Sequence, residues 1–311
     1  MNTCKDIKNL TNLAYDLKTL DTMGKTETKK LIDLCEKTYR NQIKAVATAI
    51  ASTQKKLVLI SGPSSSGKTT TANIISQELV KKGIGSLVVS IDDFFVNLED
   101  TPLLPDGTPD CENITAVDVD TFNKFIIELL TTHKAKMPRF NFRTHKRDKY
   151  EQVSINDGDI LIVEGIHALN PQLIRTNQFD SSTYNVYAFA NSIFVKNRKV
   201  VVNCQDLRLM RRVFRDTYSR GREPLYTVNN WSKVCEGEKI YISPFKTNAD
   251  CQIDTTHAYE ILVYAQYLVD LLTPYQSNDQ VKKILDILKN LSPIKKEFIP
   301  NNSLIWEFVA N

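Results

Sequence analysis

The stretch LVLISGPSSSGKTTTANIIS, residues 57–76, restricts the fold of this chain more than any other segment. It fits the pattern GxxxxGK[ST], with an apolar strand pattern before it and a helical pattern after it. Glycines let backbone N–H groups turn inward onto phosphates, and the amino terminus of the following helix adds its dipole. The pattern predicts a phosphate-binding loop made of Gly62, Pro63, Ser64, Ser65, Ser66, Gly67, Lys68, Thr69 and Thr70.

The segments around this loop alternate between strand and helix patterns. Apolar runs with the length of strands lie at residues 57–61, 86–91, 159–165, 184–190 and 199–203. Helices are expected from the loop to about residue 82 and over residues 119–132. This order is typical of a mainly parallel sheet flanked by helices. We therefore expect an α/β protein with the P-loop NTPase fold.

Helical patterns lie on both sides of this region. Residues 29–53 place apolar side chains at spacings of three and four, which predicts a helix with one buried face. Residues 257–291 are also helical in pattern. We expect a helical N-terminal extension over 1–53, a P-loop domain over 54–256, and a C-terminal helical extension over 257–311 that packs on that domain.

Composition narrows the class of protein. The 311 residues carry 40 basic and 36 acidic side chains, so the whole chain shows no charge signature of nucleic-acid binding. Six cysteines are scattered without CxxC spacing, which argues against a zinc site and favours reduced thiols. The polar start, MNTCKDIKNLTNLAYDL, lacks the apolar core of a signal peptide, and no apolar run is long enough to span a membrane. We expect a cytoplasmic protein.

Two carboxylates follow predicted strands, where ligands of open parallel sheets bind. Asp92, in SIDDFF, is placed to accept a hydroxyl proton, and Glu164, in LIVEG, to hold Mg²⁺ beside Thr69. A helix cap and a buried structural carboxylate are the alternatives. Lys68 would contact the β- and γ-phosphates. GTPases carry an NKxD-type base-reading segment, which is absent here, so a small-molecule kinase fits the chain better.

The run DLRLMRRVFRDTYSRGRE concentrates arginines on one predicted helix. At helical spacing Arg208, Arg212 and Arg215 share a face, with Arg211 next to them, while Leu209 and Val213 share another. A solvated face or a nucleic-acid patch would explain such a cluster. After a phosphate loop, it also fits a lid that neutralises charge on a transferred phosphoryl group.

Aromatic and basic residues alternate in MPRFNFRTHKRDKY, residues 137–150. Phe140, Phe142 and His145 interleave with Arg143, Lys146 and Arg147. Single-stranded nucleic acid is bound by such patterns because bases stack on rings, and a single nucleoside would be held the same way. An edge strand with a charged outer face is the third interpretation.

These motifs together resemble the uridine kinase branch of the uridine kinase and phosphoribulokinase superfamily. The matches occur in the family order over about residues 55–255, as GPSSSGKTT, SIDDFF, MPRFNFRTH, ILIVEGIHAL, DLRLMRRVFRDTYSRGR and SPFKTNAD. The resemblance implies ATP- and Mg²⁺-dependent phosphorylation of the 5′-hydroxyl of uridine, and also of cytidine, in pyrimidine salvage. It also implies a small-molecule nucleoside partner, with no nucleic acid and no membrane, and leaves a homo-oligomer open.

The resemblance also implies roles for individual residues. Asp92 matches the catalytic base, and Arg212 and Arg215 match catalytic lid arginines. On the substrate side the matching positions are Glu112 for the ribose hydroxyls, Phe140, Phe142 and His145 for the base, Arg220 and Arg222 for closure over acceptor and phosphates, and Asn230 for base reading.

Three positions depart from the family pattern. Phe140 stands where tyrosine is usual, Thr115 where aspartate is common, and Asn230 where a glutamine helps read the base. The segments TPLLPDG, GIHALNP and IPNNSLIWEFVAN resemble a longer uridine kinase-like subgroup, here without its synthetase-related N-terminal domain. A kinase for another small alcohol, such as a phosphoribulokinase- or pantothenate kinase-like enzyme, and a regulatory module without turnover remain alternatives.

Overall fold

The computed structural model describes residues 13–175 and 183–309, and these contain one central parallel sheet. Its five strands pair in the order β10-β7-β2-β6-β3, and every pair is parallel. The strands are β2 (Leu57–Ser61), β3 (Ser86–Ser90), β6 (Ile160–Glu164), β7 (Thr183–Phe189) and β10 (Cys251–Asp254). The expected α/β class with a parallel sheet is therefore confirmed.

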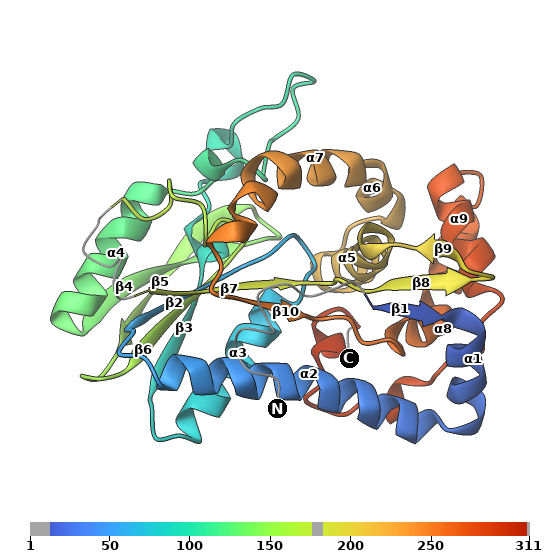
Figure 1. Ribbon diagram of the computed structural model, residues 1–311. Coiled ribbons are helices and arrows are strands. Elements are labelled where there is room, and N and C mark those ends of the chain that lie inside the picture. The colour runs from blue at the N-terminus through green and yellow to red at the C-terminus, as the bar shows by residue number, and fades with distance from the viewer. Residues whose placement is uncertain (1–12, 176–182, 310–311) are drawn as a thin grey trace.

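Helices cover both faces of this sheet, as Figure 1 shows. Side chains alternate between the faces along each strand, so Val58 and Ile60 pack with one set of helices and Leu57 and Leu59 with the other. The first face is covered by α2 (Thr28–Ala51) and α3 (Lys68–Val80), the second by α4 (Val119–Thr132). Because β2 and β6 are buried on both faces, they read as continuous apolar runs.

A second group of elements extends beyond one end of the sheet and has its own apolar core. A small sheet of order β1-β8-β9 lies there, with β1 parallel and β9 antiparallel to β8. Its members and neighbours are β1 (Ala14–Asp16), α1 (Leu17–Thr26), β8 (Ile193–Lys196), β9 (Lys199–Val202), α5 (Cys204–Arg220), α6 (Pro224–Asn229), α7 (Trp231–Tyr241), α8 (Glu260–Leu272) and α9 (Asp279–Leu288).

The aromatic and basic segment forms a separate antiparallel hairpin of β4 (Lys134–Asn141) and β5 (Lys146–Ser154). Most side chains of β5 are exposed, whereas Ala135 and Met137 of β4 are buried in the apolar core that includes α4 and the turn after β3. The sequence pattern fits an edge strand as well as a segment that binds single-stranded nucleic acid or a nucleoside. The hairpin is a two-stranded ribbon whose turn contacts the segment after β3, because the amide of Leu98 donates to the carbonyl oxygen of His145.

Predicted and observed elements agree closely in the central region. The helices expected over 29–53 and 119–132 are α2 and α4, and the runs at 184–190 and 199–203 are β7 and β9. The strand β9 belongs to the small sheet, however, so only four of the five apolar runs lie in the central sheet. The fifth strand of the central sheet is β10, whose four residues CQID carry too little apolar pattern to predict a strand.

Candidate active site

The phosphate-binding loop has the backbone shape that the motif requires. Gly67 adopts φ of 81°, and Ser65 also lies in the left-handed region at 58°. A Cβ atom at Gly62 would lie 1.8 Å from the carbonyl oxygen of Ala188, so only glycine fits there. Residues 62–67 thus form a tight turn between β2 and the amino terminus of α3. This cradle fits the phosphates of a nucleotide, because its amides and the helix dipole point at one place.

Lys68 and Thr69 open helix α3, and both side chains turn toward the site. Lys68 is 8% exposed, and its Nζ donates to the carbonyl oxygen of Pro63 at 3.0 Å. Burial lowers the pKa of Lys68, while the negative charges of Glu164 and Asp92 oppose that change. The hydroxyl of Thr69 donates to Glu164 Oε1 at 3.0 Å.

Thr69 and Glu164 offer only oxygen atoms, the ligands that Mg²⁺ prefers. Glu164 ends β6 and is 3% exposed. Burial, and then the charge of Asp92, raise the pKa of Glu164 to about 7. A buried carboxylate that lies near a second carboxylate would be stabilised by a cation. The two side chains therefore fit a magnesium site.

Asp92 and Asp93 lie in the 3-10 turn Ile91–Phe94 directly after β3, and they have different surroundings. Asp93 accepts hydrogen bonds from Arg139 Nη1 at 2.8 Å and from the amide of Phe140 at 3.2 Å, so it ties the hairpin to this turn. Asp92 is half-buried. Its charge acts on the pKa values of Lys68, Glu112, Glu164 and Arg220, so Asp92 lies near these four groups.

Arg212 reaches from α5 to the phosphate-binding loop. Its Nη1 donates to Ser64 Oγ at 2.7 Å and lies 3.7 Å from Glu112 Oε1. Glu112 is held in place by α7, since a Cβ at Gly237 would lie 2.4 Å from Glu112 Cβ. Burial raises the pKa of Glu112, and Oε2 of Glu112 is buried without a hydrogen-bond partner. The hydroxyl group of a bound substrate would donate the hydrogen bond that Glu112 Oε2 lacks.

Two of the four clustered arginines have a structural role that the helical spacing does not reveal. Arg211 is fully buried, and its guanidinium pairs with both carboxylate oxygens of Glu260 at 2.7 and 2.8 Å. Arg208 is 2% exposed and pairs with Glu238 at 2.6 Å. Each also donates to a loop carbonyl, Arg208 to Ser64 and Arg211 to Ser65. They brace the loop from α5.

Asp216 organises the remaining arginines of α5. Its carboxylate is 1% exposed and lies 2.9 Å from Arg215, 3.4 Å from Arg212 and 3.6 Å from Arg220. These positive charges lower the pKa of Asp216 to about 2, against the effect of burial. Burial, and then the charge of Arg215, lower the pKa of Arg220 to about 9. One buried carboxylate therefore holds three arginines in a single group.

The hairpin turn gathers aromatic rings beside this group. Phe140 and Phe142 meet edge to face with centroids 5.1 Å apart, and Phe95 lies 5.7 Å from Phe140. The guanidinium of Arg220 lies 4.3 Å from the centroid of Phe142. Burial, followed by the charges of Arg222 and Arg220, lowers the pKa of His145. The hairpin and the end of α5 thus face each other.

Arg222 and Asn230 lie farther along the chain. The Arg222 guanidinium lies 5.5 Å from the centroid of the Tyr226 ring, and the backbone amide of Arg222 donates to the backbone carbonyl oxygen of Asp216. Asn230 Nδ2 donates to the carbonyl oxygen of Tyr226 at 2.9 Å, at the junction of α6 and α7. The structure therefore gives Asn230 a local helix-end contact, whereas Arg222 reaches His145 through its charge.

Several residues of the site lie inside the quoted motifs, but their residue types predicted no separate role. Asp93 and Arg139 pair across two elements, Asp216 pairs with arginines of its own helix α5, and the amide of Thr70 donates to Glu307 at 3.0 Å. His167, in GIHALN, is fully buried, and burial lowers its pKa to about 4. The one sequence signal for a role of His167 is its position just after β6, since ligands of open parallel sheets bind beyond the carboxyl ends of strands.

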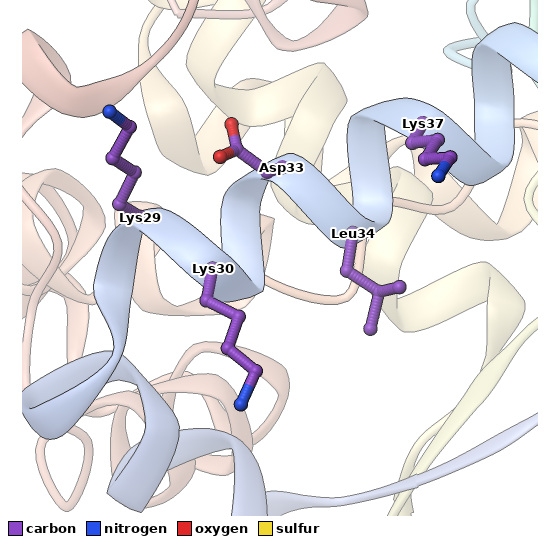
Figure 2. Close-up of a pocket in the computed structure, with 5 residues that line it drawn as sticks. All are labelled: Lys29, Lys30, Asp33, Leu34 and Lys37. Atoms are coloured by element: carbon purple, nitrogen blue, oxygen red, sulfur yellow. The ribbon is translucent and has the colours of Figure 1, made fainter.

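A hollow on the surface lies away from these residues. Figure 2 shows its lining side chains, which all come from helix α2: Lys29, Lys30, Asp33, Leu34 and Lys37. It holds a single carboxylate and no residue of the predicted site. Among the described residues, no group of three or more histidine, cysteine or acidic side chains is placed to hold a metal ion. Within the same ranges, no helix has the length and apolarity of a membrane span.

Comparison with known proteins identifies the family of the chain. Residues 57–261 match the model of the phosphoribulokinase / uridine kinase family. A uridine kinase of Halobacterium salinarum is 26% identical over 192 residues, which are 61% of this chain and 76% of that protein. A uridine kinase of Bacillus pumilus is 28% identical over 192 residues, with 61% and 82% covered.

Longer relatives and solved structures are also similar. Uridine kinase-like protein 3 of Arabidopsis thaliana is 24% identical over 262 residues, and the match spans 79% of this chain but only 52% of that protein. A solved structure described as a possible uridine kinase, from Bacillus stearothermophilus, has a TM-score of 0.40 at 23% identity. The match covers 48% of this chain and 79% of the Bacillus stearothermophilus chain.

Proposed function

Because the chain belongs to the phosphoribulokinase / uridine kinase family, we propose that it is a kinase for uridine, and also for cytidine. The product is the nucleoside 5′-monophosphate, as in pyrimidine salvage in the cytoplasm. The position of Phe140 carries the proposal, because its amide is bonded to Asp93, the neighbour of Asp92. An aromatic surface for a flat base and a carboxylate for a hydroxyl proton therefore adjoin.

The proposed donor is ATP. Its phosphates would lie against the amides of residues 62–70, with the ammonium group of Lys68 close to them. Thr69 and Glu164 would hold Mg²⁺, which neutralises charge on the phosphates when bound. Arg212 is hydrogen-bonded to Ser64 of the loop, so its guanidinium would stay close to the phosphoryl group during transfer.

In the proposed reaction the 5′-oxygen of the nucleoside forms a bond to the γ-phosphorus of ATP. The bond from that phosphorus to the β–γ bridging oxygen breaks, and ADP leaves. Asp92 accepts the hydroxyl proton. Glu112 binds the ribose hydroxyls, and Phe140, Phe142 and His145 form the base pocket. Arg215, Arg220 and Arg222 exclude water and face the developing charge.

A phosphorylated acceptor would need free cations near the hairpin. Arg147 is paired with Asp118 at 2.9 Å, and Lys146 lies 3.5 Å from Glu99. These two pairs partly neutralise Lys146 and Arg147, which favours an uncharged nucleoside at these positions. Arg143, the third basic residue of the segment, keeps a sugar phosphate open as the alternative. A regulatory role without turnover is disfavoured because Lys68, Asp92 and Glu164 are all retained.

The proposal is tested by ADP release with ATP and Mg²⁺ against uridine, cytidine, adenosine, ribulose 5-phosphate and pantothenate. We expect the highest kcat/KM for uridine or cytidine. Asp92→Asn should lower kcat by about 10²–10⁴-fold while ATP still binds. Asp100→Asn, an exposed carboxylate in the following loop, is the matched control. Preference for a phosphorylated acceptor, or a near-normal rate for Asp92→Asn, would contradict the assignment.

A further inference from the structure

The segment 303–309 lies directly on the phosphate-binding loop, although it is far away in sequence. Its 3-10 helix Leu304–Glu307 packs on α3, and Leu304 is fully buried. A Cβ at Gly67 would lie 2.6 Å from Leu304 Cδ1. The side chain of Leu304 therefore covers the second glycine of the loop.

Glu307 uses a backbone donor that a phosphate would need. The amide of Thr70 donates to Glu307 Oε2 at 3.0 Å. Thr70 lies in the first turn of α3, where amides have no partner within the helix. In a P-loop, these amides and those of the preceding loop cradle the α- and β-phosphates. A carboxylate of this chain thus occupies a position suited to a phosphate oxygen.

The neighbours of Glu307 are fixed, whereas its own side chain is only half-buried. Ser303 Oγ lies 3.2 Å from the hydroxyl of Tyr259, which in turn donates to Glu36. Phe308 is 1% exposed, and the guanidinium of Arg211 lies 4.8 Å from its ring centroid. The backbone of the segment is therefore anchored on both sides of Glu307. Only a rotation of that side chain is needed to free the amide of Thr70.

Glu307 also belongs to the electrostatic balance of the site. Its negative charge opposes the lowering of the pKa of Lys68 and adds to the raised pKa of Glu164. A nucleotide phosphate would meet the same carboxylate as a repelling neighbour. The hydrogen bond to Thr70 stabilises the protein without nucleotide. The repulsion destabilises the protein with nucleotide bound.

We propose that Glu307 is a built-in competitor of the nucleotide. In the nucleotide-free protein it caps α3 through Thr70, and a phosphate oxygen displaces it on binding. Glu307 therefore stabilises the free protein and weakens nucleotide affinity. The inference rests on nucleotide binding at the P-loop and is independent of which acceptor is phosphorylated.

The test compares wild type, Glu307→Gln and Glu297→Gln by calorimetric titration with ADP and with GDP, in Mg²⁺ and without acceptor. Glu307→Gln keeps the shape of the side chain but loses its charge. We expect it to bind the nucleotide about fivefold to tenfold more tightly and to melt at a lower temperature when nucleotide-free. Glu297 is exposed in the preceding 3-10 helix, and its variant should match wild type in both measurements.

An unchanged or weaker nucleotide affinity in Glu307→Gln would overturn the inference. A merely structural role would lower the melting temperature without tightening binding, so the two readouts separate the explanations. Failure of the proposed nucleoside kinase activity would appear in wild type as absent phosphorylation of uridine and cytidine. The titration result would still stand in that case.

Discussion

The hydroxyl of Thr69 donates a hydrogen bond of 3.0 Å to the buried carboxylate of Glu164. This contact joins the first turn of α3 to the carboxyl end of β6, two elements that the parallel sheet brings to the same edge. Two oxygen atoms that can ligate a metal ion thus lie beside the phosphate-binding loop. The proposed magnesium site depends on this pair.

Replacing Thr69 tests the metal role of the pair. Thr69→Val keeps the side-chain shape but removes the hydroxyl oxygen, so half-maximal activity should require about 10–100-fold more Mg²⁺. Thr69→Ser retains the oxygen and should stay close to wild type. Initial rates across a Mg²⁺ titration provide the measurement. Equal Mg²⁺ dependence for Val and Ser would remove Thr69 from the site.

Glu164→Gln tests the cost of burying this carboxyl. Its pKa is raised from 4.5 to about 7, mainly by burial, so the folded protein holds the proton more tightly than the unfolded chain does. Wild-type stability should therefore fall as pH rises from about 4.5 to about 7, and the variant lacks this contribution. In EDTA the variant should gain at least about 1 kcal/mol relative to wild type between about pH 5 and pH 7.5.

Urea unfolding at both pH values measures this difference, with Glu128→Gln, an exposed residue of α4, as the control. A stability difference between Glu164→Gln and wild type that does not change with pH would contradict the assigned pKa direction. Addition of Mg²⁺ should restore part of the stability of wild type alone, because only wild type keeps the carboxylate.

Asp93→Asn tests whether the hairpin is positioned from the turn that follows β3. The substitution weakens the contact with Arg139, and the KM for the nucleoside should rise about tenfold while the KM for ATP stays unchanged. Glu151→Gln removes the other carboxylate partner of Arg139, on the far strand of the hairpin, and serves as the control. A parallel rise in both KM values would indicate general disruption.

Gly67→Ala tests the close contact over the phosphate-binding loop. Gly67 and Gly83 both have positive φ, 81° and 78°, so alanine costs backbone strain of order 1–2 kcal/mol at either position. Only at Gly67 would the new Cβ meet another group, Leu304 Cδ1 at 2.6 Å, whereas nothing lies within 4 Å at Gly83. Gly67→Ala should therefore lower stability further and reduce nucleotide affinity, as thermal melts with and without ADP would show. Equal effects of the two variants would contradict this packing.

Local patterns predicted the central elements because their causes are local. The run LVLIS reads as a buried strand, and the glycine spacing requires the turn that follows it. The strand β10 was missed because CQID carries only two buried side chains, and its place in the sheet is set by pairing with β7. The residue pattern of 137–150 does not distinguish an edge strand from a binding segment, because most side chains of β5 are exposed.

The site could be predicted only as a set of residue types. Helical spacing placed Arg208, Arg211 and Arg212 together, but it could not show that Glu238 and Glu260 would neutralise the first two. Those partners come from α7 and the start of α8, and tertiary structure alone brings them to α5. The contact between Thr70 and Glu307 spans 237 positions, and no spacing rule reaches that far.

The most direct test of the proposed function is product analysis with the wild-type chain, ATP, Mg²⁺ and uridine. Chromatography with phosphorus NMR would follow both products over one time course. We expect uridine 5′-monophosphate and ADP in equal amounts, with no product when uridine is omitted. ADP formed at the same rate without uridine, or no uridine 5′-monophosphate under conditions in which ATP is bound, would contradict it.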